Sequence, residues 1–124
     1  MKILVVDDSL TMRKIIKNCL AKMGEKDVIE ASDGVEALKQ LENNQIDLIL
    51  TDWNMPNMNG LEFLIKVREN EKYKNIPVIM VTTEAEKSSV IEAIKAGANN
   101  YVVKPFTPKV LEEKIKATME KFKK

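Results

Sequence analysis

Short apolar runs alternate with amphipathic segments along the whole chain. Five runs, most of them rich in Val, Ile or Leu, predict strands that are buried on both faces; they cover residues 3–6, 28–31, 48–51, 78–82 and 100–103. In the segments between them, apolar residues recur at spacings of three and four, which predicts helices. Five strands that alternate with five helices predict a (βα)5 fold. This is a doubly wound, flavodoxin-like parallel sheet with strand order 2-1-3-4-5.

Capping signals predict where the first two helices begin or end. The first ends at Gly24 and carries one apolar stripe, formed by Met12, Ile15, Ile16, Cys19, Leu20 and Met23. The second begins at Asp33, which forms a capping-box pattern with Glu36. Its apolar positions are Val35, Leu38 and Leu41.

The remaining helices are predicted in the same way. The third covers about residues 61–70, and the fourth runs from Thr83, with Glu86 as its capping partner, to Gly97. The fifth begins at 107–108, where a threonine cap precedes a proline at the first helical position. Its apolar face comprises Leu111, Ile115, Met119 and Phe122.

Two compositional features narrow the possible chemistry. The chain has no histidine, which excludes Ser-His and Cys-His triads, histidine-ligated metals and an imidazole base. The single cysteine, Cys19, excludes an internal disulfide and a cysteine-rich zinc site, and its place on the apolar stripe indicates a core residue. Catalysis or binding must therefore use carboxylates, hydroxyls, lysines and whatever these groups bind.

Length and charge limit the organisation and the partners. We expect 124 residues to form one domain over 1–124, with no output domain. A net charge of +1 argues against nucleic acid as a partner. The first apolar run is too short for a signal peptide or a membrane span, so we expect a cytoplasmic protein that does not bind a membrane. We also expect a monomer.

Polar side chains follow the ends of four predicted strands. Asp7 and Asp8 follow the first strand, Asp52 follows the third, Thr82 ends the fourth and Lys104 follows the fifth. Neighbouring strands lie about 5 Å apart, so the three carboxylates should share one basin. Two such charges repel by about 3 kcal/mol at an effective dielectric of about 20, and this repulsion favours binding of Mg²⁺. With a lysine and a hydroxyl nearby, the group suits a phosphoryl group and an aspartate nucleophile.

Each of these residues also has an ordinary structural interpretation. Asp8 or Ser9 could cap the first helix, Asp52 could open a turn, and Lys104 could be a solvated loop lysine. Thr83 is interpreted as a cap. However, four separate structural explanations would have to hold together at one edge of the sheet, so we favour the functional interpretation.

The complete motif set resembles the receiver domain of two-component response regulators. The resemblance spans the whole chain and rests on Asp7-Asp8, the run of residues 52–60 (DWNMPNMNG), Val81-Thr82 and residues 104–106 (KPF). Residues 9–13 (SLTMR), Trp53 and residues 101–107 (YVVKPFT) are similar to single-domain chemotaxis regulators of the CheY type.

The resemblance implies a role for each site residue. Asp52 would accept a phosphoryl group from a histidine kinase. The carboxylates of Asp8 and Asp52 and the main-chain carbonyl of Asn54 would bind Mg²⁺, with Asp7 acting through water. Lys104 and Thr82 would contact the phosphoryl oxygens, and the bond between Lys104 and Pro105 would be cis.

The resemblance also implies an output surface made by the fourth helix, the fifth strand and the fifth helix. In this family the aromatic residue that matches Tyr101 turns inward on activation, although the sequence alone slightly favours a half-exposed strand tyrosine. A flagellar motor switch protein would bind this surface, and a phosphatase is a further possible partner. The expected contact residues are Lys87, Val90, Ile94, Tyr101, Val103 and Lys114.

Several other functions remain open at this point. A stand-alone phosphorelay intermediate would use the same site. A Mg²⁺-dependent phosphohydrolase also uses an aspartate nucleophile, but it commonly has a second acid two residues later, where this chain has Asn54. A flavodoxin-like cofactor carrier needs a phosphate loop that Asp7 and Asp8 would repel. A binding module that never takes phosphate would not need the complete acid set.

Overall fold

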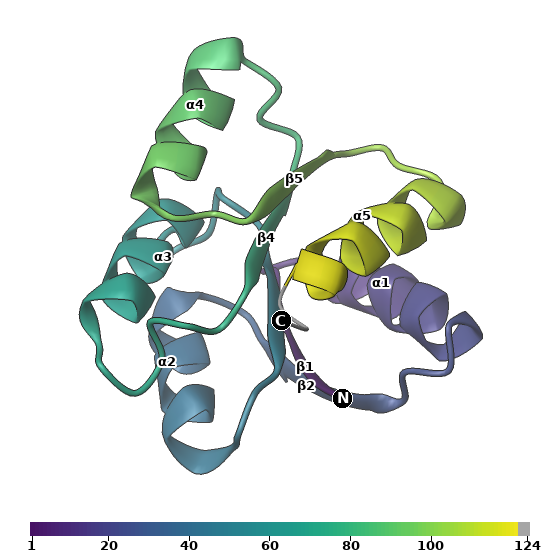
Figure 1. Cartoon of the computed structure of the whole chain (residues 1–124), viewed down its shortest axis with the longest axis horizontal. Helices are drawn as coiled ribbons and strands as arrows, with labels where there is room; N and C mark the ends of the chain where they lie inside the picture. The colour runs from purple at the N-terminus through teal and green to yellow at the C-terminus, as the bar shows by residue number, and fades with distance from the viewer. Residues whose placement is uncertain (122–124) are drawn as a thin grey trace.

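One five-stranded parallel sheet forms the centre of the molecule (Figure 1). The structure is a computed structural model and describes residues 1–121. The strand order is β2-β1-β3-β4-β5, as the alternation of elements predicts. The strands are β1 (Lys2–Val6), β2 (Asp27–Ala31), β3 (Leu48–Thr51), β4 (Val78–Thr82) and β5 (Asn100–Val103).

Helices cover both faces of the sheet. Figure 1 shows α2, α3 and α4 on one face and α1 and α5 on the other. The helices are α1 (Leu10–Lys22), α2 (Gly34–Asn43), α3 (Gly60–Glu69), α4 (Lys87–Ala96) and α5 (Pro108–Lys121). None of the helices described is long and apolar enough to cross a membrane.

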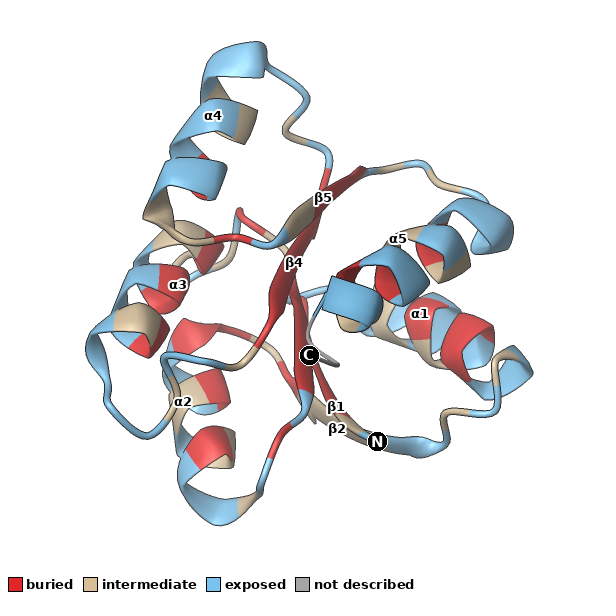
Figure 2. Ribbon diagram, viewed as in Figure 1, coloured by how far each residue is buried: buried red, intermediate tan, exposed pale blue. Residues whose placement is uncertain are grey.

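The two faces of the sheet bury separate apolar cores. Alternate side chains of each strand point to opposite faces, so Leu4 and Val6 of β1 enter the core under α2 and α3, whereas Ile3 and Val5 enter the core under α1 and α5. The central strands β3 and β4 are buried along their whole length (Figure 2). This double burial explains why the strands read as continuous apolar runs.

The start of α4 differs from the prediction. The pattern of Thr83 and Glu86 predicts a helix from Thr83, but α4 begins at Lys87, and Glu86 is its N-cap without a side-chain cap bond. The preceding backbone is held in another conformation: the Thr82 hydroxyl accepts the Glu84 N–H at 3.3 Å, and the Glu84 carbonyl accepts the Tyr101 hydroxyl at 2.6 Å. Thr83 is therefore an exposed loop residue and not a cap.

The other caps largely follow the sequence. Ser9 caps α1, and Asp33 caps α2 by accepting the Glu36 N–H at 2.8 Å. The Glu36 carboxylate accepts the N–H of Ser32 and not that of Asp33. At α3 a complete capping box links Asn59 and Glu62, which the sequence analysis missed.

Two residues assigned to apolar stripes are exposed. Ile15 on α1 is 43% exposed and Val35 on α2 is 40% exposed, so these two apolar positions lie outside the core. Cys19 is buried, as predicted. Phe122 lies outside the described residues.

Candidate functional site

The carboxyl edge of the sheet brings the predicted site residues together. Val6 of β1 pairs with Thr51 of β3, and the Asp52 N–H donates to the Val6 carbonyl at 2.9 Å. Asp7 and Asp52 therefore leave neighbouring strands at the same level. On the other side, Thr82 of β4 pairs with Val103 of β5, which precedes Lys104. The prediction that these strand ends meet is confirmed.

Lys104 forms ion pairs with two of the aspartates. Its Nζ atom lies 2.6 Å from Asp7 Oδ2 and 3.2 Å from Asp52 Oδ2. The side chains are only 9%, 2% and 12% exposed for Lys104, Asp7 and Asp52, respectively. Charges this poorly hydrated require a partner, so the ammonium group compensates both carboxylates. The peptide bond from Lys104 to Pro105 is cis, as the resemblance implies.

Asp7 is the most buried of the three acids. Burial raises the pKa of its carboxyl group above the ordinary value, while the hydrogen bonds from Lys104 and the Ser9 N–H act in the opposite direction. Oδ1 accepts the Ser9 N–H at 2.9 Å and Oδ2 accepts the lysine. Both oxygens are therefore held in fixed directions.

The three carboxylates form a group with the donor chemistry of a cation site. One oxygen from each of Asp7, Asp8 and Asp52 lies within 4.8 Å of the others. Asp8 is exposed, so the group is open to solvent on that side, and Asn54 is also exposed just beyond Asp52. Three carboxylates and one ammonium leave an excess of negative charge. Oxygen ligands with this charge fit a hard divalent ion such as Mg²⁺.

Asp52 is fixed by the turn that follows it. The Trp53 N–H donates to Asp52 Oδ1 at 2.7 Å, and the Gly60 N–H donates to the Trp53 carbonyl at 2.8 Å. A Cβ atom on Gly60 would lie 1.9 Å from the Asp52 carbonyl oxygen. Only glycine fits there, and the sequence analysis did not assign Gly60 a role. A glycine at the start of a helix does not by itself indicate a close contact. The requirement for glycine comes from Asp52, eight positions earlier in the chain, and no local pattern reveals it.

Thr82 connects the acidic edge to the loop before α4. Its side chain is fully buried, and its hydroxyl accepts the Glu84 N–H. Tyr101 is 9% exposed and binds the Glu84 carbonyl through its hydroxyl. The interpretation of Tyr101 as a half-exposed strand residue is therefore wrong.

Comparisons with known proteins show the family to which the chain belongs. The sequence model described as the response regulator receiver domain matches residues 3–116. The chain belongs to this family. The receiver domain is 60% identical over 116 residues to the chemotaxis protein CheY homolog of Campylobacter jejuni, covering 93% of this chain and 89% of the relative. It is 57% identical over 120 residues to chemotaxis protein CheY1 of Helicobacter pylori, covering 96% and 97%.

A solved structure supports the same fold. The chemotaxis response regulator CheY4 of Vibrio cholerae superposes on this receiver domain with a TM-score of 0.86 at 37% identity, covering 94% of this chain and 97% of that one. The predicted fold class is therefore confirmed.

The expected output surface of the receiver domain is mostly accessible. α4 and β5 carry exposed aliphatic side chains, of which Ile94 is 47% exposed and Val103 is 41% exposed. Lys87 is exposed, and Val90 and Lys114 are partly exposed. Tyr101 is the buried member of the expected contact set. It lies beneath this surface and contacts the loop before α4.

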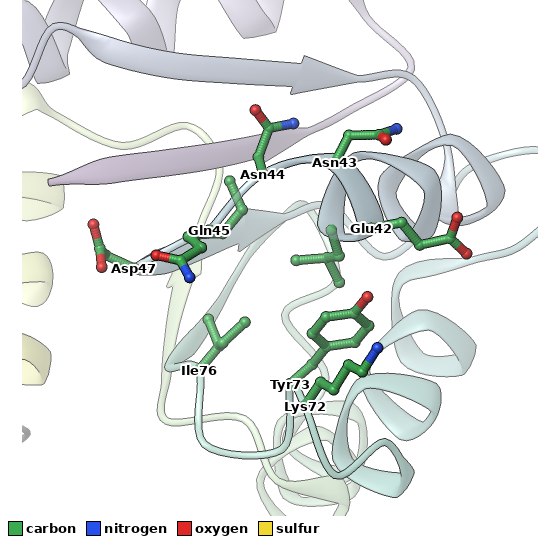
Figure 3. A pocket seen from close by; sticks show the side chains of 10 residues that line it. Glu42, Asn43, Asn44, Gln45, Asp47, Lys72, Tyr73 and Ile76 are labelled. Carbon is green, nitrogen blue, oxygen red and sulfur yellow. The ribbon is translucent and has the colours of Figure 1, made fainter.

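A hollow lies at the opposite edge of the sheet. This open pocket of about 670 Å³ is lined by the end of α2 and the loop before β4, with Tyr73 and Ile76 on one side (Figure 3). The side-chain amides of Asn43 and Asn44 already donate hydrogen bonds to carbonyls one turn earlier in α2. The Asp47 carboxylate accepts the Lys2 N–H at 2.7 Å. The acidic edge, and not this cavity, is the candidate functional site.

Proposed function

We propose that this receiver domain is a chemotaxis response regulator whose Asp52 accepts a phosphoryl group from the phosphohistidine of a histidine kinase. The proposal rests mainly on one observation: the Lys104 ammonium forms ion pairs with both Asp7 and Asp52 in the acidic group. The close relatives named for chemotaxis support the cellular role.

The chemistry needs one nucleophilic oxygen and a set of charged groups around it. An Asp52 carboxylate oxygen forms a bond to phosphorus while the P–N bond to the kinase imidazole breaks, and the imidazole nitrogen keeps the electron pair. Lys104 is close enough to neutralise charge on the phosphoryl oxygens. Thr82, at the end of β4, offers a hydroxyl donor to one of those oxygens. The domain acts as a phosphoryl acceptor rather than as an enzyme with a small-molecule substrate.

Mg²⁺ would be held by the carboxylates of Asp8 and Asp52 and by the Asn54 carbonyl, with Asp7 acting through water. When bound, the ion supplies positive charge that lowers the repulsion between the incoming phosphoryl group and the acidic group. Asp7 is suited to an indirect role because its two oxygens already accept bonds from Ser9 and Lys104.

Phosphorylation would alter the output surface through Thr82. Replacing a charge of −1 on Asp52 by about −2 adds strong acceptors that attract the Thr82 hydroxyl and Lys104. The Thr82 hydroxyl would then leave the Glu84 N–H, and Glu84 also binds Tyr101. The resulting change in α4 and β5 would favour binding of a flagellar motor switch protein and end when a phosphatase or water removes the phosphoryl group.

Trp53 provides a direct test because it is the only tryptophan and its main-chain N–H donates to Asp52 Oδ1. We expect Mg²⁺, and then acetyl phosphate in the presence of Mg²⁺, to change its fluorescence. Asp52→Asn should remove the response to acetyl phosphate. A wild-type protein that responds to neither reagent, or an Asp52→Asn protein that responds to the donor like wild type, would overturn the proposal.

A second experiment separates chemotaxis from a phosphorelay. A peptide from the motor switch protein should bind the phosphorylated domain more tightly than the unphosphorylated one. Ile94→Ala on α4 should weaken that binding, whereas Ile65→Ala on α3, an isoleucine that is 40% exposed against 47% for Ile94, should not. If the peptide does not bind in either state and the phosphoryl group passes to a histidine-containing phosphotransfer protein, the relay function holds instead.

A further inference from the structure

The main-chain carbonyl of Asp7 lies just beyond the last paired residues of β1 and β2. The register of these strands ends at Val6 and Ala31, and the Ala31 carbonyl accepts the Asp7 N–H at 3.0 Å. The carbonyl of Asp7 is bound instead by a side chain from α1. Arg13 Nη1 donates to it at 2.6 Å. A side chain thus replaces the missing strand hydrogen bond at the point where the acidic group begins.

The guanidinium group of Arg13 is held from its other side by Glu30 of β2. Arg13 Nε donates to Glu30 Oε1 at 3.0 Å, and Lys17 Nζ donates to Glu30 Oε2 at 3.1 Å. The Arg13 side chain is only 15% exposed. A planar guanidinium with several fixed donors can link a carboxylate and a carbonyl at once, which a single ammonium group does less well. Arg13 therefore joins α1, β2 and the end of β1.

These contacts leave Asp7 with four fixed polar groups. Its N–H binds Ala31, its carbonyl binds Arg13, and its two carboxylate oxygens bind Ser9 and Lys104. Two of these partners, Ala31 and Ser9, contribute main-chain groups, and Lys104 belongs to the acidic edge itself. Arg13 is the partner that fixes the direction of the peptide plane after Asp7, and hence the start of the loop that carries Asp8.

We propose that Arg13 is a positioning residue for the acidic group, which it serves by fixing the Asp7 main chain and thereby the directions of the Asp7 and Asp8 carboxylates. This inference rests on the proposed Mg²⁺-dependent function. Removing Arg13 should weaken Mg²⁺ binding on the order of 10-fold, the usual effect of losing a group that orients metal ligands.

The charge of Arg13 alone predicts the opposite change in Mg²⁺ affinity. A positive charge beside a cation site repels the cation, so removing the charge of Arg13 without any positional effect would tighten Mg²⁺ binding. The direction of the change in Mg²⁺ affinity therefore distinguishes a positioning effect of Arg13 from an effect of its charge. Arg13→Lys separates the two further, because it keeps the charge but loses the planar group that spans the Asp7 carbonyl and Glu30.

The test is a Mg²⁺ titration followed by Trp53 fluorescence at constant ionic strength. We expect weaker binding in both Arg13→Met and Arg13→Lys. Lys17→Met is the matched control, since Lys17 lies one turn later, shares Glu30 and has no hydrogen bond to Asp7. It should leave the midpoint unchanged or lower it slightly. In the metal-free protein, hydrogen exchange of the Ser9 amide should accelerate in the Arg13 variants and not in Lys17→Met.

Urea unfolding of each variant checks that the compared proteins are folded. If Arg13→Met does not fold, the comparison of Arg13→Lys with wild type is used. Unchanged or tighter Mg²⁺ binding in Arg13→Lys would overturn the role of Arg13, as would an equal loss in Lys17→Met. If the wild-type protein itself gives no Mg²⁺ response, the proposed function fails. The exchange rate of the Ser9 amide then still reports whether Arg13 orders this loop.

Discussion

The Tyr101 hydroxyl of β5 donates a 2.6 Å hydrogen bond to the Glu84 carbonyl in the loop before α4. Burial of the ring raises the pKa of Tyr101 to about 12, and the negative charges of Glu84 and Asp52 add to this shift. The neutral hydroxyl is therefore a stable donor throughout the physiological pH range. It joins β5, a part of the proposed output surface, to the loop between β4 and α4.

Replacing Tyr101 with Phe should destabilise the domain by about 1 kcal/mol near pH 9, because the Glu84 carbonyl loses its donor. This difference should shrink as the pH rises above 10. An unfolded tyrosine loses its proton near pH 10 whereas Tyr101 keeps it to about 12, so the unfolded state binds fewer protons in this window and the free energy of unfolding falls with pH.

Urea unfolding of both proteins at pH 9 and pH 11 measures this difference. All lysines and Tyr73 are common to the two proteins, so their titration cancels in the comparison. A gap between the wild type and Tyr101→Phe that stays constant over this range would show that Tyr101 ionises in the folded protein at the ordinary pKa.

Replacing Lys104 with Met should lower the free energy of unfolding by about 3 kcal/mol at pH 7 and low Mg²⁺, because Asp7 and Asp52 lose the ammonium that compensates them. A second substitution, Asp7→Asn, should restore part of the loss by removing one unpaired charge. Added Mg²⁺ should also reduce the loss, since a bound cation would take over the compensation.

Lys14→Met is the control for this experiment, because Lys14 is exposed on α1 and its removal should change stability by less than about 0.5 kcal/mol. Chemical denaturation of the single and double variants, with and without Mg²⁺, provides the measurement. Equal stabilities of Lys104→Met and Lys14→Met would contradict the structural role of the buried ion pairs.

The sequence predicts the strands and the acidic edge because both depend on short-range patterns and one rule of topology. Buried parallel strands appear as apolar runs, and residues that follow neighbouring parallel strands must meet at one edge. Asp7 and Asp52 could therefore be placed beside Lys104 although they lie 97 and 52 residues from it, respectively, along the chain.

Features made by long-range contacts could not be predicted in this way. Thr83 and Glu86 match a capping-box pattern, but the Tyr101 bond to Glu84 holds the backbone outside the helix. Arg68 resembles any basic residue in the last turn of a helix. Its partners include the carbonyls of Ile76 and Gly97, which lie in loops 8 and 29 residues further along the chain. No pattern in the sequence around Arg68 predicts these contacts.

Replacing Arg68 with Met should destabilise the domain by about 2 kcal/mol or more. Arg68 donates to the carbonyls of Gly97, Lys74 and Ile76, and these acceptors would lose a charged donor. Arg68→Lys should recover only part of the loss because one ammonium cannot reach all three carbonyls in the two loops. The contacts to Gly97 hold the end of α4, so hydrogen exchange should increase there first.

Lys66→Met serves as the control for Arg68, because both residues are in the last turn of α3 and carry the same charge. Lys66 is exposed, and its loss should change the urea midpoint only slightly. A similar loss of stability in the two variants would mean that the hydrogen bonds of Arg68 contribute little beyond the charge of the helix end.

Replacing Gly60 with Ala should both destabilise the domain and weaken Mg²⁺ binding. The new Cβ atom would meet the Asp52 carbonyl oxygen at 1.9 Å, so either α3 or the backbone of Asp52 must move. We expect a loss of about 3 kcal/mol, since overpacking typically costs about 1–3 kcal/mol and here the neighbour is main chain. A displaced Asp52 should then raise the Mg²⁺ midpoint in the Trp53 fluorescence titration.

Gly34→Ala is the matched comparison because Gly34 is likewise the first residue of its helix, and its Cβ would meet Met58, with Cγ at 2.7 Å and Cβ at 2.9 Å, rather than the backbone of Asp52. Met58 must shift to accept this Cβ, so Gly34→Ala should also lose stability, but Met58 is not part of the acidic group and Mg²⁺ binding should stay unchanged. If Gly60→Ala retained the wild-type Mg²⁺ midpoint while losing stability, the contact with Asp52 would serve packing alone. The close approach of α3 would then play no part in fixing Asp52, the proposed phosphoryl acceptor.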